Sequence, residues 1–389
     1  MSQDSTVVCV VCGGPAGEPV YASDRECSIT SLCEVVPSPT VVRFCQACGH
    51  VQTTEMPGIE AYYDTQYKIL IESEEEDQLY AMSNGQKVYR LDHQARTLLR
   101  KLTPSAAARI LDYGSAKGGT LKRLLAERGD LRVHLFDVSA MYLPFWKAFL
   151  DEGRWATYRP PAAWRGTFDI ITSFFSLEHV ARPREMMAEI ASLLKPGGTF
   201  YGIVPNTFTN IADFVVIDHV NHFSAASLAF LLRASGFGNI DIDEHAHTSA
   251  FVVTATAAVQ QGTVAGIPRS EIARLGSEVE RIAAYWRNFS SCVREFEDGR
   301  TGRPAAIYGS GFYGTFIASC LSRPLDIRCF VDQNPFRQGR RLLDRPIIAP
   351  EALPEEIGTV YVGLNPVLAR AEIAKVACWS GRRLDHFLP

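Results

Sequence analysis

Residues 109–119 read RILDYGSAKGG, a stretch that begins as an apolar strand and ends in a glycine-rich turn. The pattern predicts a strand over Arg109–Tyr113 and a helix over Gly118–Arg128. Glycines at such a turn let the backbone approach a ligand at the N-terminus of the helix. This βα unit predicts an α/β fold for the chain around it.

Strand and helix patterns continue to alternate on the C-terminal side of this unit. Helices are expected over Met141–Leu150 and Arg184–Leu194. The further strands are expected at Arg132–Asp137, Phe168–Ser173, Thr199–Val204, Ile240–Glu244 and Ala250–Thr256. Such alternation predicts a mostly parallel sheet with helices on both faces. The short connection between the last two strands predicts an antiparallel hairpin.

The chain divides into four segments by its sequence patterns. A module rich in cysteine with its connector occupies residues 1–80, the α/β domain 81–262, a long helical linker 263–302, and a second α/β domain 303–389. Apolar residues at helical spacing predict one helix from Ser270 to Asp298. In the last segment we expect strands at Ala305–Tyr308, Ile327–Val331 and Thr359–Gly363 and a helix at Tyr313–Leu321.

Length and composition limit the class of protein. The 389 residues exceed one ordinary core, and 47% hydrophobic with 21% charged residues is typical of a globular protein. The net charge of -4 without a basic tract gives no reason to expect a nucleic-acid partner. No apolar run or signal-peptide pattern stands out, so we expect a cytoplasmic protein without membrane contact. The acidic run Glu72–Asp77 is expected to be the solvated face of a helix.

Two Cys-x-x-Cys knuckles, Cys9–Cys12 and Cys45–Cys48, stand near the N-terminus, and each is followed by glycine. Each knuckle places two thiolates where one tetrahedral zinc ion can bind both. Four thiolates leave no open coordination position, so the predicted zinc is structural. The alternatives are a redox dithiol or cysteines without a ligand. Cys27 and Cys33 lie outside the pattern and are expected to be buried thiols.

Asp137 ends the second predicted strand, where a carboxylate can accept hydrogen bonds from both ribose hydroxyls of an adenosine. The glycine turn and this residue alone do not separate NAD from S-adenosylmethionine. Two later stretches do: FDIITSFFSLEHV at 168–180 and LLKPGGT at 193–199. Together they resemble the class I methyltransferases over about residues 81–262, although Ser115 and Ala116 replace the commoner Gly-x-Gly form of the loop.

This resemblance implies a seven-stranded sheet that binds S-adenosylmethionine at the carboxyl ends of its first strands. The implied cofactor contacts come from the ends of the first two strands, the glycine loop after the first, and the end of the fourth strand of the family's sheet, at Phe168–Ser173. They are Asp112, Tyr113, Gly114, Ala116, Gly118, Asp137, Val138 and Phe174.

Histidines near two strand ends are the candidate catalytic residues. Asp218 and His219 follow the strand at Thr199–Val204, which corresponds to the fifth strand of the family's sheet. A histidine and a carboxylate there suit proton transfer. His222 lies just beyond them, and its alternative role is packing or capping of the helix that Ser224 opens. His179 follows the fourth strand, and for it packing or capping is again the alternative.

The whole chain resembles the three-domain C-methyltransferases of deoxysugar biosynthesis, which act on nucleotide-linked keto sugars. The order of knuckles, methyltransferase core, long helix and terminal α/β domain carries this resemblance. It implies zinc on the four knuckle cysteines and places Tyr67, His179 and the pair Asp218–His219 at the substrate. Asp218 stands where the family has glutamate, and His222 where it has tyrosine.

The resemblance also implies how the substrate is bound and activated. His219, aided by Asp218 or Tyr67, would remove a proton from carbon next to a ketone, with His179 or His222 steadying the enolate oxygen. Tyr63 and Asn206 are further candidates for substrate contact, although the tyrosines of the connector are equally well explained as core. The main alternative reaction is O- or N-methylation of another activated metabolite.

The last segment contains a second glycine turn, Gly309-x-Gly311-x-x-Gly314, and Asp332 ends the following strand. A pyrophosphate could bind at that helix N-terminus, and the resemblance assigns it to the nucleotide end of the substrate. The alternative is a related fold without a ligand. An NAD(P)-dependent oxidoreductase built on this segment is disfavoured, because residues 303–389 are too few for a dinucleotide domain and a substrate domain.

Overall fold

The computed structural model describes residues 7–69, 71–83, 86–258 and 265–389. The chain forms two compact units. The first comprises residues 1–22 and 40–280, and the second residues 23–39 and 281–389. The cysteine-rich segment is therefore divided: its knuckles belong to the first unit, whereas the loop between them belongs to the second.

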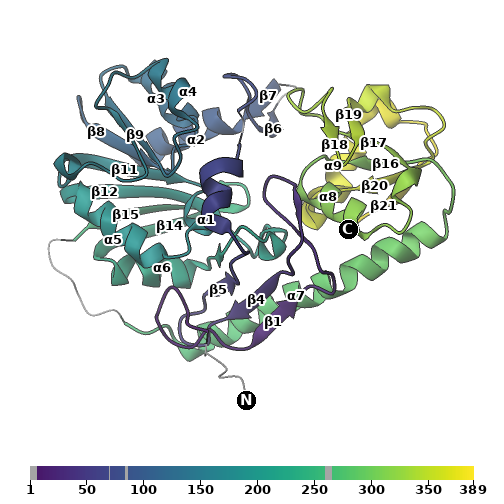
Figure 1. Cartoon of the computed structure of the whole chain (residues 1–389), viewed down its shortest axis with the longest axis horizontal. Helices are drawn as coiled ribbons and strands as arrows, with labels where there is room; N and C mark the ends of the chain where they lie inside the picture. Colours follow the sequence, from purple (N-terminus) through teal and green to yellow (C-terminus); the bar gives the residue numbers. More distant parts are fainter. Residues whose placement is uncertain (1–6, 70, 84–85, 259–264) are drawn as a thin grey trace. The chain divides into compact units, whose positions relative to one another are not determined.

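Within the described residues, the first unit is built on a seven-stranded sheet of order β10-β9-β8-β11-β12-β15-β14 (Figure 1). Its strands are β8 (Arg109–Tyr113), β9 (Arg132–Asp137), β10 (Trp155–Thr157), β11 (Phe168–Phe174), β12 (Leu194–Pro205), β14 (Phe237–His247) and β15 (Ala250–Ala257). The five strands from β10 to β12 run parallel, and β15 and β14 close the sheet as an antiparallel hairpin. The predicted seven-stranded α/β core is thus confirmed.

Helices cover both faces of this sheet, as the nearly continuous burial of its parallel strands requires. One face packs against α2 (Arg90–Lys101), α3 (Gly119–Glu127) and α4 (Leu143–Lys147). The other packs against α5 (Pro183–Leu193) and α6 (Ala225–Ala234). Each large apolar side chain removed from water between these layers contributes roughly 1.5–3 kcal/mol. The helix α2 and the three-residue strand β10 were not predicted from the sequence.

The acidic run Glu72–Asp77 was wrongly expected to be a solvated helix face. The described residues of this run form no helix, and the side chains of Glu76 and Asp77 are buried. The ammonium group of Lys117 donates hydrogen bonds to three backbone carbonyls of this stretch. The run is therefore held against the start of α3 by its backbone, which sequence periodicity does not reveal.

The knuckle module contributes a second sheet to the first unit. Its order is β1 (Pro19–Ala22), β4 (Val41–Phe44), β5 (Val51–Thr53) and β13 (Asn221–His222). The last strand comes from the segment between β12 and α6, and it pairs antiparallel with β5. This pairing joins the cysteine module to the carboxyl end of the methyltransferase-like sheet. Beyond β5 follow α1 (Ile59–Ala61), the π-helix η1 (Tyr62–Gln66), β6 (Leu79–Ser83) and β7 (Gln86–Tyr89).

The second unit is also α/β. Its described sheet has the order β18-β19-β17-β16-β20-β21, in which β16 (Ala305–Tyr308) is central and parallel to β17 (Ile327–Val331) and β20 (Thr359–Val362). The edge strands are β18 (Arg341–Leu342) and β21 (Asp385–Phe387), and β19 (Arg345–Ile348) lies between β18 and β17. Its helices are α8 (Phe312–Cys320), α9 (Pro366–Ala374) and the C-terminal part of α7 (Arg269–Asp298), the predicted long helix. Cys33 is buried as expected, while Cys27 is only partly buried.

A short hairpin from the N-terminal segment packs on this second unit. It comprises β2 (Ser28–Ile29) and β3 (Val35–Val36). The Arg25 guanidinium lies 4.4 Å from the ring centroid of Phe316 and donates a 2.7 Å hydrogen bond to the Ser319 hydroxyl. These contacts explain why residues 23–39 belong to the second unit.

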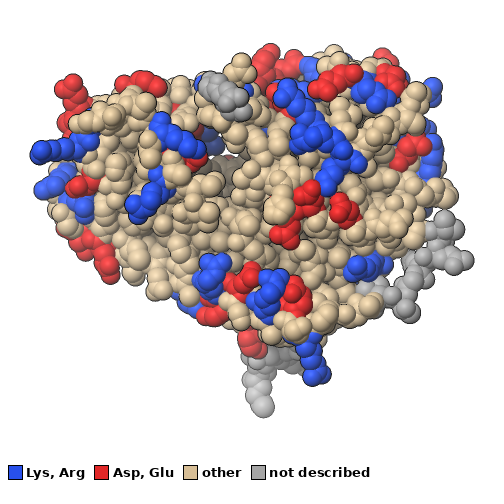
Figure 2. All heavy atoms as spheres, turned by 180° about the vertical axis from the view of Figure 1, so that it is seen from behind, with Lys and Arg blue, Asp and Glu red and all other residues tan. Residues whose placement is uncertain are grey.

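The surface carries charges of both signs. On the face shown in Figure 2, basic and acidic side chains lie interspersed among larger uncharged areas. Within the described part of the chain, no helix combines the length and apolar character that a membrane crossing requires.

Candidate active site and zinc site

The loop between β8 and α3 has the tight form that a cofactor loop needs. Gly114 and Gly118 have φ of 79° and 70°, and Ala116 also takes a positive φ of 45°. A Cβ atom at Gly114 would lie 2.4 Å from the Ser176 hydroxyl oxygen, so only glycine fits there. The loop therefore brings backbone close to the end of β11, as the sequence pattern predicts for a nucleotide ligand.

Asp137 lies at the carboxyl end of β9, next to this loop. One carboxylate oxygen accepts a 2.8 Å hydrogen bond from the Ala116 amide, and the other accepts one of 3.2 Å from the Ser139 amide. The side chain is 8% exposed, and burial raises its pKa to about 6. An acidic acceptor beside a glycine loop fits the ribose of an adenosine, so these residues suit S-adenosylmethionine. Val138, the next predicted contact, is exposed.

The other predicted cofactor residues occupy different surroundings. Asp112 is buried and accepts a 2.8 Å hydrogen bond from the Thr172 hydroxyl, and burial raises its pKa to about 7. The Tyr113 hydroxyl donates to Glu189 of α5, so the side chain of Tyr113 lies on the α5 face and only its backbone belongs to the loop. Phe174 is half-buried at the end of β11.

His219 pairs with a carboxylate that the sequence did not suggest. Its Nδ1 lies 2.5 Å from an oxygen of Asp213, in the 3₁₀ turn η4 (Asp213–Val215). Burial alone would lower the pKa of His219, but the hydrogen bond and charge of Asp213 outweigh burial and raise the pKa to about 9. The pair leaves Nε2 of His219 as the ring nitrogen available for chemistry. The partner of His219 is therefore Asp213 and not the adjacent Asp218.

Asp213 is completely buried and joins two histidines. Its second oxygen lies 2.9 Å from Nδ1 of His222 and also accepts from the Thr207 hydroxyl. Nε2 of His222 lies 2.7 Å from the Thr53 hydroxyl, in β5. Since His222 is 0% exposed and both of its ring nitrogens are paired, it holds Asp213 in place. The geometry thus favours the alternative that His222 packs, here as a residue that positions Asp213.

His179 lies on the other side of His219, in the 3₁₀ turn η3 (Leu177–His179). The two rings are perpendicular, with centroids 4.6 Å apart. Nδ1 of His179 is 2.7 Å from the Tyr63 hydroxyl and 3.1 Å from the Asp218 carbonyl oxygen. The Tyr63 hydroxyl also donates to that carbonyl, at 2.8 Å. Burial, together with the charge of His219, lowers the pKa of His179 to about 4.

Tyr67 and Glu178 complete the cluster. The Tyr67 ring centroid is 5.4 Å from that of His179 and 5.2 Å from that of Tyr63. Glu178 is 1% exposed, and burial raises its pKa to about 8. Glu178 and Asp213 are the two polar residues that sequence reasoning missed. Glu178 could have been proposed from the sequence, because it stands inside the LEHV stretch at 177–180. Asn206 lies apart in the turn after β12, where its side-chain oxygen accepts a 3.1 Å hydrogen bond from the Phe208 amide.

The four knuckle cysteines converge at one point. The sulfur atoms of Cys9 and Cys48 are 3.6 Å apart, those of Cys12 and Cys45 are 3.5 Å apart, and all four lie within 4.8 Å of one another. Thiolates about 2.3 Å from one tetrahedral zinc ion are separated by about 3.8 Å, so the group fits zinc. The glycines after each knuckle have φ of 79° and 65°, as the turns require.

The second glycine turn is explained largely by its own packing. A Cβ atom at Gly309 would lie 2.4 Å from the Gly363 carbonyl oxygen, and one at Gly314 would lie 2.0 Å from the Gly309 carbonyl oxygen. Asp332 accepts hydrogen bonds from the amide and hydroxyl of Ser310. Gly311 alone faces open space, so it is the position of this turn where a ligand has room.

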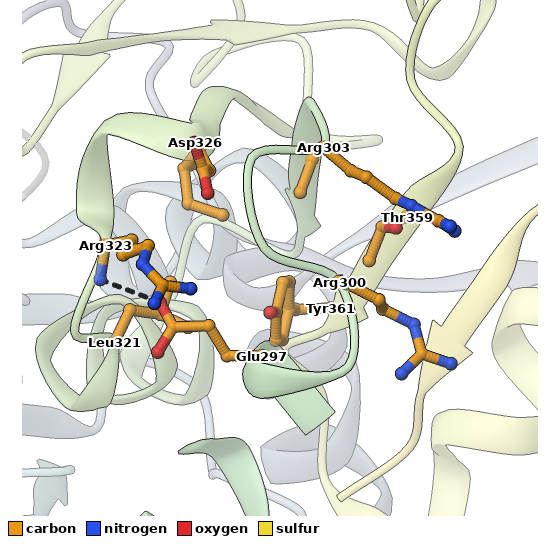
Figure 3. Close-up of a pocket in the computed structure, with 10 residues that line it drawn as sticks. Glu297, Arg300, Arg303, Leu321, Arg323, Asp326, Thr359 and Tyr361 are labelled. Atoms are coloured by element: carbon orange, nitrogen blue, oxygen red, sulfur yellow. Dashed lines mark hydrogen bonds between the residues drawn. The ribbon is translucent and has the colours of Figure 1, made fainter. Parts of the chain in front are cut away.

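A recess in the second unit lies at the opposite end of the sheet (Figure 3). Its lining includes Ala305, Ile327 and Thr359, which begin three parallel strands. Glu297 in this recess accepts a 2.7 Å hydrogen bond from the Arg323 amide, so one oxygen of its carboxylate already has a partner within the protein. Ligands of open α/β sheets bind at the carboxyl ends of the strands, and this recess is therefore a different place from the predicted nucleotide turn.

Comparison with known proteins agrees with the fold of the first unit. Residues 88–242 match a family model described as a methyltransferase domain. Ubiquinone biosynthesis O-methyltransferase of Xanthomonas axonopodis pv. citri (strain 306) is 34% identical over 108 residues, which cover 25% of this chain and 42% of that protein. The corresponding enzyme of Xanthomonas campestris pv. campestris (strain B100) is 34% identical over 100 residues, with 24% and 41% covered. The chain thus spans about two fifths of the length of these relatives.

Solved structures of methyltransferases are also similar to the chain. An S-adenosylmethionine-dependent methyltransferase from Mesorhizobium loti is 17% identical with a TM-score of 0.35, and the match covers 43% of this chain and all of that one. Human N-acetylserotonin methyltransferase in complex with S-adenosylmethionine is 14% identical with a TM-score of 0.36, and the match covers 43% and 52%. Residues 88–242 thus match a methyltransferase domain, and the strand order and the glycine loop are those that the sequence resemblance implies.

We predict that the four-cysteine site retains one zinc ion through dialysis against a mild chelator. Cys45→Ser removes one of four ligands, so this zinc should be lost and thermal stability should fall, because a structural zinc contributes directly to folding. Metal analysis by mass spectrometry measures the effect. Cys292→Ser, at an exposed cysteine of α7, is the matched control and should keep its zinc. Equal zinc content in both variants would contradict the assignment.

We predict that S-adenosylmethionine affinity depends on ionised Asp137. Because the pKa of this carboxyl is about 6, affinity should be highest above pH 7 and should fall as the pH drops through 6. Asp137→Asn removes charge-assisted hydrogen bonds worth roughly 1.5–3 kcal/mol, which is about 10- to 150-fold in affinity. Calorimetric titration from pH 7.5 to 5 tests this. A variant whose affinity and pH profile match the wild type would rule out the contact.

Proposed function

We propose that the protein transfers the methyl group of S-adenosylmethionine to carbon in a small, nucleotide-linked keto sugar. The observation that carries this proposal is the Asp213–His219 pair. It stands past the carboxyl end of β12, close to His179, where the methyltransferase domain would present a reactive group to its acceptor. The sugar substrate rests on the resemblance of the whole chain to the deoxysugar C-methyltransferases.

Bound S-adenosylmethionine would supply a methyl group on a positively charged sulfur, which a nucleophilic carbon can take. The chain has to generate that nucleophile. His219 is oriented through Nδ1 by Asp213. In the deprotonated fraction of the protein, which grows as the pH rises toward the His219 pKa of about 9, Nε2 would accept a proton from the carbon next to the ketone. Tyr63 and the Asp218 carbonyl fix the His179 ring beside it through Nδ1, which leaves Nε2 as the ring nitrogen that would face the developing enolate oxygen. Tyr67 would bound the same space.

The turn that contains Gly311 is the proposed place for the pyrophosphate of the nucleotide. Its open position beside the N-terminus of α8 supports this assignment, since amide groups at a helix N-terminus favour anions. Zinc on the four cysteines has a structural role in this proposal.

O-methylation of another metabolite is the second candidate. It is favoured by the relatives, which are O-methyltransferases by name. The same histidine would then accept a proton from a hydroxyl group. Incubation with labelled S-adenosylmethionine and a panel of nucleotide-linked keto sugars, with mass spectrometry of the products, separates the two reactions. Labelled methyl on carbon supports the first proposal, and labelled methyl on oxygen replaces it with the second. Transfer to none of the sugars removes this substrate class.

We predict that His219→Asn lowers turnover by 10²–10⁴-fold, the usual loss when a general base is removed. Cofactor affinity should stay within a few-fold of the wild type, because His219 lies outside the glycine loop. Steady-state kinetics and calorimetric titration measure the two quantities. His245→Asn changes an exposed histidine of β14 and should leave both unchanged. A folded His219→Asn protein with near-normal turnover would end the assignment and make Tyr67 or His179 the leading candidate.

A further inference from the structure

We infer that Glu178, His179 and His219 form a binding site for one divalent transition-metal ion, separate from the four cysteines. One ligand atom from each residue lies within 4.8 Å of the others. Glu178 and His179 come from the turn η3 after β11, and His219 comes from the segment before β13. Two imidazoles and one carboxylate from two strand ends thus meet at one point.

Both histidines are arranged as metal ligands usually are. Nδ1 of His219 is held by the Asp213 carboxylate, and Nδ1 of His179 is held by the Tyr63 hydroxyl and the Asp218 carbonyl. A ligating histidine almost always uses its second nitrogen to contact a carboxylate or carbonyl in this way, which fixes the ring and its tautomer. The nitrogen left for an ion is therefore Nε2 in both rings.

Glu178 supplies the third and least expected ligand. Its side chain is 1% exposed, and among the described residues its Oε2 has no hydrogen-bond partner. A buried carboxylate oxygen without a partner is unfavourable, and buried charges normally are paired or bind a metal. A protonated His219 would place one positive charge near Glu178. A divalent ion between the three residues would place two positive charges near Glu178, and it would also bind the Oε2 atom that has no hydrogen-bond partner.

The ligand set indicates the class of ion. Imidazole and carboxylate ligands suit Zn²⁺, Fe²⁺ and Mn²⁺, and three protein ligands leave positions open for water or a substrate oxygen. The four-cysteine site, by contrast, is complete without a further ligand. The next step rests on the proposed function. The open position of the ion would bind the carbonyl or hydroxyl oxygen of the methyl acceptor and orient it. His219 would then be a ligand and not the proton acceptor. The ion would make the acceptor's proton more acidic, and hydroxide at a remaining open position would take that proton and become water.

Titration with Co²⁺ tests the site without reference to methyl transfer. Zinc-loaded full-length protein would be freed of weakly bound metal and titrated with Co²⁺, followed by calorimetry and visible absorption. We expect one equivalent to bind with ligand-field bands and without the near-ultraviolet thiolate-to-cobalt band that cysteine ligands produce. Glu178→Gln, which keeps the shape of the side chain, should weaken this binding by at least about 10-fold, because loss of even an outer-shell partner of a ligand costs roughly 10- to 100-fold.

Controls separate loss of a ligand from loss of structure. Glu178→Gln should keep its four-cysteine zinc and its S-adenosylmethionine affinity, and His245→Asn should bind Co²⁺ like the wild type. If the zinc-loaded wild type bound no equivalent of Co²⁺, the inference would be overturned. Equal Co²⁺ binding by Glu178→Gln, or a thiolate-to-cobalt band in the spectrum, would overturn it as well. Failure of the sugar assay would remove the proposed substrate and leave these readouts unaffected.

Discussion

The buried carboxylate of Asp213 is the interaction on which the site depends. Burial removes the hydration of this carboxylate, which is unfavourable for a charged group. Hydrogen bonds compensate for that cost, because each oxygen contacts an imidazole nitrogen and one also accepts from the Thr207 hydroxyl. Removing one partner from such a buried pair typically costs about 3–5 kcal/mol, since the remaining charge is left uncompensated. In the proposed function His219 is the reactive residue, whereas His222 is enclosed and structural. The position of His219 is thus fixed by the same carboxylate that anchors the segment after β12.

The cysteine module reaches the active site through this anchor. The knuckle Cys45–Cys48 lies between β4 and β5, and β5 pairs with β13, the strand that contains His222. From the module, His50 contacts the Asn221 side chain at 3.1 Å, and the Asn221 amide donates to the carbonyl oxygens of Leu177 and Val180 on either side of Glu178 and His179. One short strand therefore positions both halves of the site. A zinc ion that held the knuckles would stabilise the chemistry from a distance, without touching a substrate.

Local patterns in the sequence predicted most of the fold. The strand bounds of β8, β9, β16 and β17 agree with the predicted ranges, because buried parallel strands are short apolar runs with clear ends. What could not be predicted depends on tertiary contacts. The two-residue strand β13 has no periodicity of its own, and Asp213 is one carboxylate among 43 acidic residues until folding brings it to His219. The choice of Asp218 as the partner followed from adjacency in sequence, but the chain turns at residues 217–218, where the His219 amide donates to the Val216 carbonyl oxygen, and the His219 ring meets Asp213 instead.

The charge of the cluster explains what kind of group it accepts. Three carboxylates, those of Glu178, Asp213 and Asp218, are each at most 1% exposed around two imidazoles. In surroundings of low dielectric constant such a set favours any added positive charge, whether a proton on His219, a divalent ion or the sulfonium of a methyl donor. It would equally disfavour an anionic acceptor, unless a cation came with it. An acceptor that is neutral at its reacting end, such as the ketone of a sugar, satisfies this constraint. Negative charge on such an acceptor develops only when its proton leaves, and by then a positively charged group is already in place.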